Sequence, residues 1–354
     1  MTRRSTDVII IGAGIIGLST ALELRRLGEK VLVLDRSEPG REASFAGAGM
    51  LAAADINGPP PLPQMAKASA GMYAEFVGGL QADSKVRVDF RRQGAIVLGG
   101  KAHGTRLTAQ ELRRLEPELA WRGKAAYFLH EDCVDPRTLM KALLRSAKRR
   151  GIRVLGASQV RRIDVHLDTV TGVRTAAGHI PSRVVINCAG AWAGASGFGF
   201  APTRPVRGHL LALAPGRTEF LRHVIRHPQK DIYLLPRTGG PIVVGSTIEE
   251  AGFRKAVDLA IARSLQESAV SLFPALEDAK VVERWTGLRP GTPDGLPILG
   301  ETPIRGYFVA TGHYRNGILL APVTARLLAQ LVAGAEPAID LAPVSPLRFA
   351  PDRR

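Results

Sequence analysis

The N-terminal pattern of this chain constrains its fold more than any other feature. An apolar run rich in β-branched residues, Val8 to Ile11, predicts a short strand buried on both faces. A glycine-rich turn with the sequence GAGIIG, Gly12 to Gly17, follows directly, and apolar residues at helical spacing then continue to a stop at Gly28. A second apolar strand ends at Asp35. Strand, glycine turn, helix and strand in this order predict a dinucleotide-binding unit of the Rossmann type.

The spacing within this unit matches the requirements of a pyrophosphate site. Gly12 permits a tight turn, Gly14 lets the backbone approach a pyrophosphate, and Gly17 lets the helix pack closely on the strand. Unpaired N–H groups at the helix N-terminus then face the anion. Asp35 lies eighteen residues after Gly17, where a carboxylate accepts hydrogen bonds from the ribose hydroxyls of an adenosine. Because this acid disfavours a 2′-phosphate, we expect FAD or NAD rather than NADP.

Composition argues against several other classes of protein. The chain of 354 residues can hold two domains, or one domain with another inserted, and its two cysteines, Cys133 and Cys188, are too few for a metal cluster, so we predict no metal. The net charge of +16 comes from scattered basic pairs without a long basic run or aromatic interleaving. We therefore expect no nucleic-acid binding and interpret the charge mainly as solvated surface, with acidic partners or membrane surfaces as the lesser alternative.

The N-terminus also allows a targeting segment to be considered. Arg3-Arg4 before an apolar stretch is the usual start of a signal peptide, but charges at Glu23 and Arg25 soon interrupt it and no cleavage site follows. No other segment has eighteen uninterrupted apolar residues. We expect a cytoplasmic protein without a membrane span.

Two segments after the N-terminal unit are predicted to border a ligand, and a third region is predicted to form a β-hairpin. Small residues dominate Pro39 to Leu51, which suits backbone that lies flat against a flat ligand. Arg183 to Trp192 reads as a buried strand that ends in small residues near the same ligand. The apolar runs Val86 to Phe90 and Ala95 to Leu98 flank a Gln-Gly pair and predict a β-hairpin.

Two helices carry clear boundary signals. Asp135 as N-cap and Pro136 at the first helical position predict a helix to Arg150, followed by a third parallel strand. A closing helix is predicted from Ile318 to Val332, and Pro322 predicts a kinked or late-starting first turn.

The C-terminal third resembles a known family. The run WTGLRPGTPDGLPILG, Trp285 to Gly300, is similar to many amine-oxidising flavoproteins, and GHYRNGILLAP, Gly312 to Pro322, is more specific to glycine oxidases. These are FAD enzymes of the D-amino-acid oxidase superfamily that are associated with thiamine biosynthesis. The resemblance spans nearly the whole chain, and it implies non-covalent FAD as the cofactor, since no cysteine follows Cys188 to attach the flavin there.

The resemblance implies roles for particular residues. Arg289 matches the arginine that grips the substrate carboxylate, Tyr233 a tyrosine that bonds to the same group, and Arg315 a second substrate-side residue. Together with the glycine turn, the implied cofactor-binding residues are Gly12, Gly14, Ile15, Ile16, Gly17, Asp35, Arg36, Ser44, Ala48, Gly49, Met50, Val160, His313, Tyr314, Arg315, Asn316, Gly317, Ile318 and Leu319. Two positions depart from the family pattern, with Ile248 in place of methionine and Asp231 in place of histidine, which leaves the side-chain size preference open.

Pattern and resemblance together predict an α/β fold: a Rossmann-type FAD-binding domain with an inserted antiparallel-sheet α+β substrate domain. The FAD-binding domain is expected to be discontinuous, over residues 1–84, 135–200 and 286–345, with the substrate domain over 85–134 and 201–285 and a tail at 346–354.

The implied activity is oxidation of a small amino acid, glycine above all, by hydride transfer from Cα to flavin N5, with oxygen as acceptor. The products would be the imino acid, then glyoxylate, ammonia and hydrogen peroxide. The resemblance also implies that the enzyme supplies thiamine thiazole synthesis. No side chain is assigned as a catalytic acid or base, because the flavin carries the chemistry. We expect a homo-oligomer. Alternatives that remain open are a sarcosine, proline or D-amino-acid oxidase, an FAD-dependent amino-acid dehydrogenase with another acceptor, and, more remotely, a flavoprotein that acts on nucleic acid.

Overall fold

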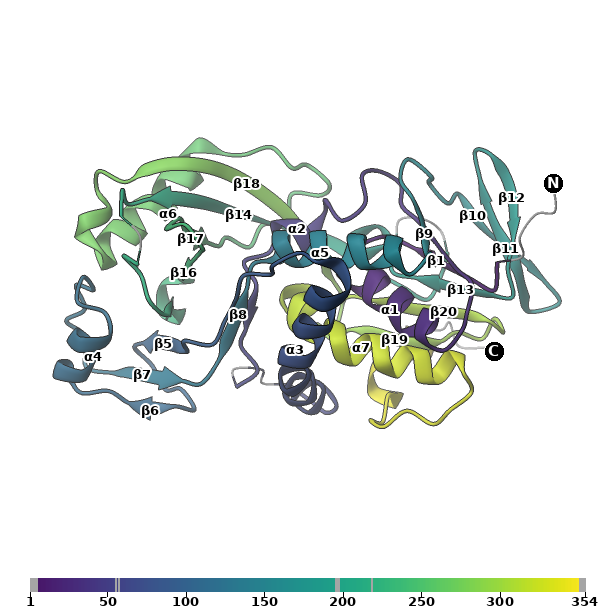
Figure 1. Ribbon diagram of the computed structural model, residues 1–354, viewed down its shortest axis with the longest axis horizontal. Helices are drawn as coiled ribbons and strands as arrows, with labels where there is room; N and C mark the ends of the chain where they lie inside the picture. Colours follow the sequence, from purple (N-terminus) through teal and green to yellow (C-terminus); the bar gives the residue numbers. More distant parts are fainter. Residues whose placement is uncertain (1–5, 55, 57, 195–197, 218, 350–354) are drawn as a thin grey trace.

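The computed structural model describes residues 6–54, 56, 58–194, 198–217 and 219–349. Figure 1 shows an elongated molecule with one mixed α/β lobe and one lobe dominated by a large sheet. Helices α2 (Ala43–Ala46), α3 (Leu62–Ser84) and α5 (Pro136–Arg149) lie near the middle of the molecule, where the two lobes meet. Residues 1–5 and 350–354, which include the predicted signal-like arginines and most of the predicted tail, lie outside the described part of the chain.

The α/β lobe is built on a six-stranded sheet in the order β19-β20-β13-β1-β2-β9. Neighbouring strands are parallel except for the antiparallel pair β19–β20 at one edge. This is the predicted Rossmann-type arrangement, and β9 is the predicted third parallel strand. The strands are β1 (Val8–Ile11), β2 (Val31–Leu34), β9 (Arg153–Leu155), β13 (Val184–Asn187), β19 (Ile298–Glu301) and β20 (Tyr307–Thr311).

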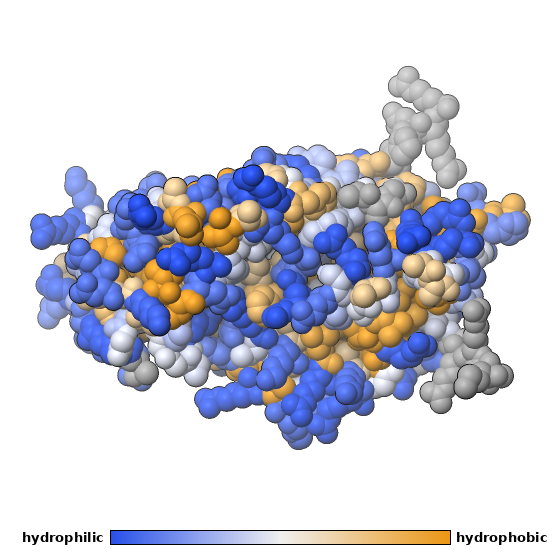
Figure 2. All heavy atoms as spheres, turned by 90° about the horizontal axis from the view of Figure 1, so that it is seen from above, coloured by the Kyte–Doolittle hydropathy of each residue, from blue (hydrophilic) through white to orange (hydrophobic). Residues whose placement is uncertain are grey.

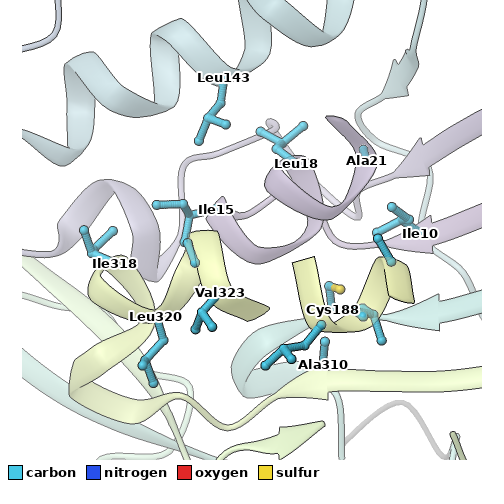
Figure 3. Packing of buried hydrophobic residues seen from close by; sticks show 14 of the residues in the cluster. Ile10, Ile15, Leu18, Ala21, Leu143, Cys188, Ala310, Ile318, Leu320 and Val323 are labelled. Carbon is cyan, nitrogen blue, oxygen red and sulfur yellow. The ribbon is translucent and has the colours of Figure 1, made fainter. Parts of the chain in front are cut away.

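Helices α1, α5 and α7 cover one face of this sheet. Figure 3 shows Leu18 of α1 beside Leu143 of α5, Ile15 of α1 above Val323 of α7, and Ile10 of the sheet at the right. The central strands β1, β2 and β13 are buried at every position and, apart from Asn187, apolar, because both of their faces are covered. The helices of the molecule are α1 (Ile15–Arg26), α2 (Ala43–Ala46), α3 (Leu62–Ser84), α4 (Ala109–Leu115), α5 (Pro136–Arg149), α6 (Leu259–Leu272) and α7 (Gly317–Val332).

Local signals placed the helix ends well where a side chain acts as a cap. The carboxylate of Asp135 accepts from the N–H groups of Arg137 and Thr138, as predicted for the start of α5. At α7 Pro322 predicted a kinked or a late-starting first turn, and the late start is wrong, while the kink stays a prediction. The helix begins at Gly317, one residue before the expected position, and Pro322 lies inside it. Side chains of α3 complete the hydrogen bonding there, as described below.

The second lobe holds an eight-stranded sheet in the order β18-β14-β17-β16-β15-β5-β7-β6. Long strands β14 and β18 pair antiparallel over eleven positions and cross toward the first lobe (Figure 1). The strands are β5 (Ala95–Leu98), β6 (Thr105–Arg106), β7 (Ala126–Leu129), β14 (Arg204–Ala214), β15 (Val224–His227), β16 (Ile232–Pro236), β17 (Ile242–Gly245) and β18 (Lys280–Gly291).

The predicted β-hairpin around Gln93-Gly94 is wrong. β5 pairs with β7 and β15, whereas the preceding run contributes only Phe90–Arg91, which pairs with β8 in a different sheet. The run Ala95–Leu98 does form a strand, whereas of the run Val86–Phe90 only Phe90 lies in one, and both strands pair with more distant partners. The two smaller sheets contain β3 (Met50–Leu51), β4 (Phe90–Arg91) and β8 (Asp132–Val134), and β10 (Arg162–His166), β11 (Thr169–Thr175) and β12 (Gly178–Pro181).

The face of the molecule seen in Figure 2 mixes hydrophilic and hydrophobic side chains. Figure 2 shows hydrophilic side chains over most of the visible face, interrupted by smaller hydrophobic areas. Among the described residues, no helix has the length and apolar character needed to cross a membrane, and no cluster of metal-binding side chains is found. The domain boundaries named above remain predictions.

Candidate functional site

A cavity of about 660 Å³ lies between the two large sheets. Its walls come from both, so neither lobe forms the site alone. One end is lined by the glycine turn after β1 and by Asp35, and the other by strands β14, β16 and β18 and the segment before α7. Of the predicted cofactor residues, those on the cavity wall are Gly12, Gly14, Ile15, Ile16, Asp35, Arg36, Ser44, Ala48, Gly49, Met50, Val160, His313, Tyr314, Arg315, Asn316, Gly317 and Ile318.

The N-terminus of α1 opens into this cavity without a side-chain cap. Gly14 occupies the cap position, no acidic residue lies in the first turn, and the Ile15 N–H donates to Ser44 Oγ at 2.9 Å. Gly12 has φ = +102°, and a Cβ there would lie 2.4 Å from the carbonyl oxygen of Cys188. Backbone is therefore presented where a pyrophosphate needs N–H donors.

Gly17 is not on the cavity wall. A Cβ at this position would lie 2.1 Å from the Gly12 carbonyl oxygen, so the glycine allows helix α1 to contact the turn. This close contact is the packing role that the motif predicts. Leu319, also assigned to the cofactor, does not line the cavity either. Its side chain is 2% exposed and belongs to the hydrophobic core, because the helix turns it away from the cavity after Ile318.

Asp35 lies at the end of β2 and already accepts two backbone hydrogen bonds. One oxygen is 2.8 Å from the Ala13 N–H and the other 2.9 Å from the Ser37 N–H. These contacts fix the carboxylate beside the glycine turn, on the cavity wall. Next to it, the Arg36 guanidinium lies 3.9 Å from the centroid of Trp192, which also lines the cavity. The site therefore includes an aromatic wall that the motif did not identify.

The segment from His313 to Ile318 forms the opposite end of the cavity. The His313 ring is 3% exposed, and its Nε2 lies 3.0 Å from Thr324 Oγ1 of helix α7. Burial lowers the pKa of His313 to about 4, so the ring is neutral near pH 7. A neutral ring bonded to α7 fits a structural role in this segment better than that of a general base.

Arg289 extends from β18 into the cavity and is held by neutral groups. Its Nη1 donates to the carbonyl oxygens of Thr247 at 3.0 Å and Arg207 at 3.4 Å, and its Nη2 donates to Ser246 Oγ at 2.7 Å. No carboxylate among the described residues forms an ion pair with it. Burial lowers the pKa of Arg289, the Tyr233 side chain acts in the opposite direction, and the charge of Arg315 lowers the pKa further. An arginine remains charged even so, and this one is fixed in place without a counter-ion from the residues that the structure describes.

Glycines allow Arg289 and Tyr233 to converge across the sheet. Their strands, β18 and β16, are separated by β14 and β17, a span of roughly 14 Å at ~4.8 Å per strand. A Cβ on Gly208 of β14 would lie 2.3 Å from Arg289 Nη1, and one on Gly245 of β17 would lie 2.7 Å from the Tyr233 hydroxyl oxygen. The two side chains therefore lie flat over bare backbone and reach toward each other.

A carboxylate behind Arg289 holds the strands that carry its acceptors. The Glu249 side chain accepts from Arg207 Nη2 at 2.6 Å, from His209 Nδ1 at 2.6 Å and from the Thr247 hydroxyl. Because His209 Nε2 accepts from the Asp258 N–H, Nδ1 carries the proton in this network. Hydrogen bonds from these partners outweigh burial and lower the pKa of Glu249 to about 2. Glu249 thus fixes the two residues whose carbonyls orient Arg289.

The remaining substrate-side predictions have different placements. Arg315 lines the cavity and is exposed, with no ion pair to any described residue. Asp231 lines the cavity at the turn before β16, whereas Ile248 is 51% exposed and is not on the cavity wall. Of the two departures from the family pattern, only Asp231 therefore faces the site.

Comparisons with known proteins agree with this architecture. A family model described as FAD dependent oxidoreductase matches residues 7–331. The glycine oxidase of Pseudomonas aeruginosa is 33% identical to this chain over 97% of it and 99% of the relative. The crystal structure of glycine oxidase from Geobacillus kaustophilus aligns with a TM-score of 0.91 and 30% identity, covering 98% of this chain and 99% of that one.

The chain belongs to the family of FAD-dependent oxidoreductases. The bifunctional protein ThiO/ThiG of Synechocystis sp. is a further relative, 34% identical over 98% of this chain and 54% of that protein. FAD is accordingly the cofactor, and the residues present fit it: an uncapped helix N-terminus suits the pyrophosphate, and an acid at the end of β2 suits the ribose.

Sequence reasoning missed several residues of this family member's site. Trp192 was recognised only as the end of a strand, and Ser246, Gly208 and Glu249 were not singled out. The strand predicted to run to Trp192 ends at Asn187, and Trp192 lies in a short 3-10 helix. The signals for these residues are tertiary, since each contacts a residue from another segment of the chain. A glycine in a strand does mark a position where another group approaches closely, and that rule would have pointed to Gly208.

Proposed function

We propose that this FAD-dependent oxidoreductase oxidises glycine, or a closely similar small amino acid, to the imino acid, which hydrolyses to glyoxylate and ammonia. The observation that carries the proposal is Arg289, a guanidinium fixed in the cavity by neutral acceptors and without a carboxylate partner among the described residues. A cation in this state is suited to bind the carboxylate of an incoming substrate. The glycine oxidases among the relatives support the choice of substrate.

Each residue contributes binding or orientation rather than proton transfer. Arg289 supplies two parallel N–H donors, which fix both the position and the angle of a carboxylate. In this proposal, Tyr233 reaches across the sheet from β16 and bonds to the same carboxylate. Orientation of this kind can lower the activation free energy by ~7–11 kcal/mol, whereas a single charge-assisted hydrogen bond contributes ~1.5–3 kcal/mol of binding free energy. FAD, when bound, supplies the acceptor for the hydride that leaves the substrate Cα.

Arg315 and Asp231 define the outer part of the site in this proposal. Both residues line the cavity and Arg315 is exposed, so the proposal assigns them to the space that a substrate side chain or N-substituent would enter. This arrangement keeps sarcosine, proline and D-amino acids as alternative substrates. The family membership, by contrast, gives no support to a role on nucleic acid.

We further propose oxygen as the electron acceptor, non-covalent attachment of FAD, a homo-oligomeric state and a supporting role in thiamine thiazole synthesis. The relative named ThiO/ThiG supports the last of these. Both cysteines are free and buried, which fits a reducing compartment, and we propose a cytoplasmic location.

A single preparation tests the main proposal. The purified protein should show a flavin absorption spectrum that bleaches on anaerobic addition of glycine and recovers with formation of hydrogen peroxide when air is admitted. Parallel additions of sarcosine, D-alanine and proline rank the substrates. Bleaching without recovery in air, but with recovery by a quinone or dye, would identify a dehydrogenase, and no bleaching by any of the four would reject the proposed class of substrate.

A further inference from the structure

Helix α7 contains a proline that interrupts its hydrogen-bond ladder close to the cavity. Pro322 has no N–H, so the carbonyl of Ile318 lacks the donor that an α-helix would supply from four residues ahead. Ile318 lines the cavity, as does Gly317, the first residue of the helix. The first turn of α7 therefore has one backbone hydrogen bond to the rest of the helix fewer than a helix without proline would have. The missing bond lies where the helix borders the cavity.

Two hydroxyl groups of helix α3 complete this part of α7. The Tyr73 hydroxyl donates to the Ile318 carbonyl oxygen at 2.8 Å. The Ser69 hydroxyl donates to the Leu319 carbonyl oxygen at 2.6 Å and accepts from the Val323 N–H at 3.3 Å, so it bridges the next donor and acceptor of the ladder. Ser69 and Tyr73 are four residues apart, which places them on one face of α3.

These contacts are more specific than ordinary satisfaction of buried hydroxyls. Ser69 and Tyr73 are both 0% exposed. Elsewhere in the described core, the hydroxyls of Ser19, Thr20 and Ser146 are buried without any hydrogen-bond partner, so burial alone does not impose partners in this protein. The Tyr73 ring also packs against two phenylalanine rings: Phe76, edge-on with 5.7 Å between ring centroids, and Phe90, with 6.0 Å between centroids. The hydroxyl therefore has a fixed direction.

We propose that Ser69 and Tyr73 are positioning residues for the flavin: they hold the proline-interrupted first turn of α7 so that its N-terminus faces the cavity at a fixed distance. Helix N-terminal N–H groups carry a partial positive charge that stabilises a negative charge nearby. The charge of the reduced flavin ring would be stabilised in this way. If the Tyr73 hydroxyl were lost, the Ile318 carbonyl would be buried without a donor, and the turn would move to reach one. The inference rests on FAD binding in this cavity, but not on glycine being the substrate.

The test compares three single variants that each remove one hydroxyl. Tyr73→Phe and Ser69→Ala remove the two α3 hydroxyls that bond to α7. Ser146→Ala removes an equally buried hydroxyl that has no hydrogen-bond partner among the described residues. The measurements are the dissociation constant of FAD and the dissociation constant of sulfite for the FAD-loaded protein. Sulfite forms a bond to the flavin ring and leaves a negative charge on it, so its affinity reports the positive potential nearby. We expect both constants to rise about tenfold in Tyr73→Phe and Ser69→Ala and to stay unchanged in Ser146→Ala.

A rescue variant separates positioning from general packing. Pro322→Ala restores an N–H four residues after Ile318, and that group can replace the Tyr73 hydroxyl as donor. The effect of Tyr73→Phe on sulfite affinity should therefore shrink to less than threefold in the Pro322→Ala background. Equal effects of Tyr73→Phe in both backgrounds, or the same constants in Tyr73→Phe and Ser146→Ala, would overturn the inference. A wild-type protein that binds FAD and sulfite but does not oxidise glycine would reject the proposed substrate and leave this inference standing.

Discussion

Arg289 Nη1 lies 3.0 Å from the carbonyl oxygen of Thr247, and the Thr247 hydroxyl in turn donates to the carboxylate of Glu249. The cation that we assign to substrate binding is thus oriented by a backbone group, while the only nearby carboxylate of this network is occupied by Arg207, His209 and Thr247. Because of this separation, Arg289 forms no ion pair with any carboxylate in the described part of the chain. The Arg289 guanidinium can then form an ion pair with a substrate carboxylate.

The bidentate role of Arg289 predicts a large effect of a substitution that keeps its charge. Arg289→Lys should lower kcat/KM for glycine roughly hundredfold, because an ammonium cannot reproduce the planar pair of donors. Arg284→Lys is the matched control, since Arg284 is exposed on the same strand. Steady-state peroxide production measures both. Wild-type kcat/KM in Arg289→Lys would show that this side chain does not hold the substrate.

The bare backbone under Arg289 predicts an effect of one methyl group. Gly208→Ala places a Cβ 2.3 Å from Arg289 Nη1, so the guanidinium must move and the KM for glycine should rise at least ~10-fold. Gly78→Ala is the control: a Cβ at Gly78, in helix α3, meets nothing within 4 Å, and the exchange should raise stability by ~0.5–1 kcal/mol. Kinetics with glycine and thermal unfolding distinguish the two. An unchanged KM in Gly208→Ala would place the substrate away from Arg289.

Glu249 predicts a loss of both stability and substrate affinity. Glu249→Gln leaves Arg207 (5% exposed) and His209 (1% exposed) without their charged partner, and the free energy of unfolding should fall by ~3 kcal/mol. The KM for glycine should rise as the acceptors of Arg289 shift. The neighbouring exposed pair between Glu250 and Arg204 provides the control, and Glu250→Gln should cost less than ~1 kcal/mol.

The pH dependence of that variant gives an independent check. The pKa of Glu249 is about 2, below its ordinary value of 4.5, so the stabilisation is complete above pH 4.5 and is lost as the pH falls toward 2. Unfolding by denaturant at pH 4.5 and pH 3.5 should therefore show a steeper loss of stability in the wild-type protein than in Glu249→Gln. Parallel losses would mean that this carboxylate is not held in its charged form.

His313 predicts a second and separate pH window. Its pKa is lowered to about 4 by burial, whereas the unfolded chain has the ordinary value of 6.5. Between these values the unfolded state binds the extra proton, so stability falls as the pH decreases from 6.5 to 4, by at most ~3 kcal/mol from this residue. His227, whose pKa burial also lowers, adds to the same trend. Denaturant unfolding of His313→Gln should lose less stability over this range than wild type, and an equal loss would assign the trend to other groups.

Local signals predicted the nucleotide-binding half of the molecule well. Val8 to Asp35 forms the parallel β1-α1-β2 unit, and the capping residue Asp135 marks the start of α5. These features are encoded by neighbours in sequence: strand, turn and helix each depend on the residues within them. The prediction of a hairpin around Gln93-Gly94 failed for the opposite reason, because an apolar run such as Ala95–Leu98 indicates a strand but not which strand it pairs with.

The site divides in the same way. The sequence by itself determined the glycine turn, the acid at Asp35 and, through resemblance, Arg289 and Tyr233 as side chains of the cavity. Only the tertiary structure decided how these residues act: that Gly208 and Gly245 let Arg289 and Tyr233 lie across two intervening strands, that Glu249 fixes the acceptors of Arg289, and that Tyr73 supplies the donor removed by Pro322. The physical reason is that each of these contacts joins residues from different elements, so it depends on sheet order and helix packing, which no local pattern of side chains specifies.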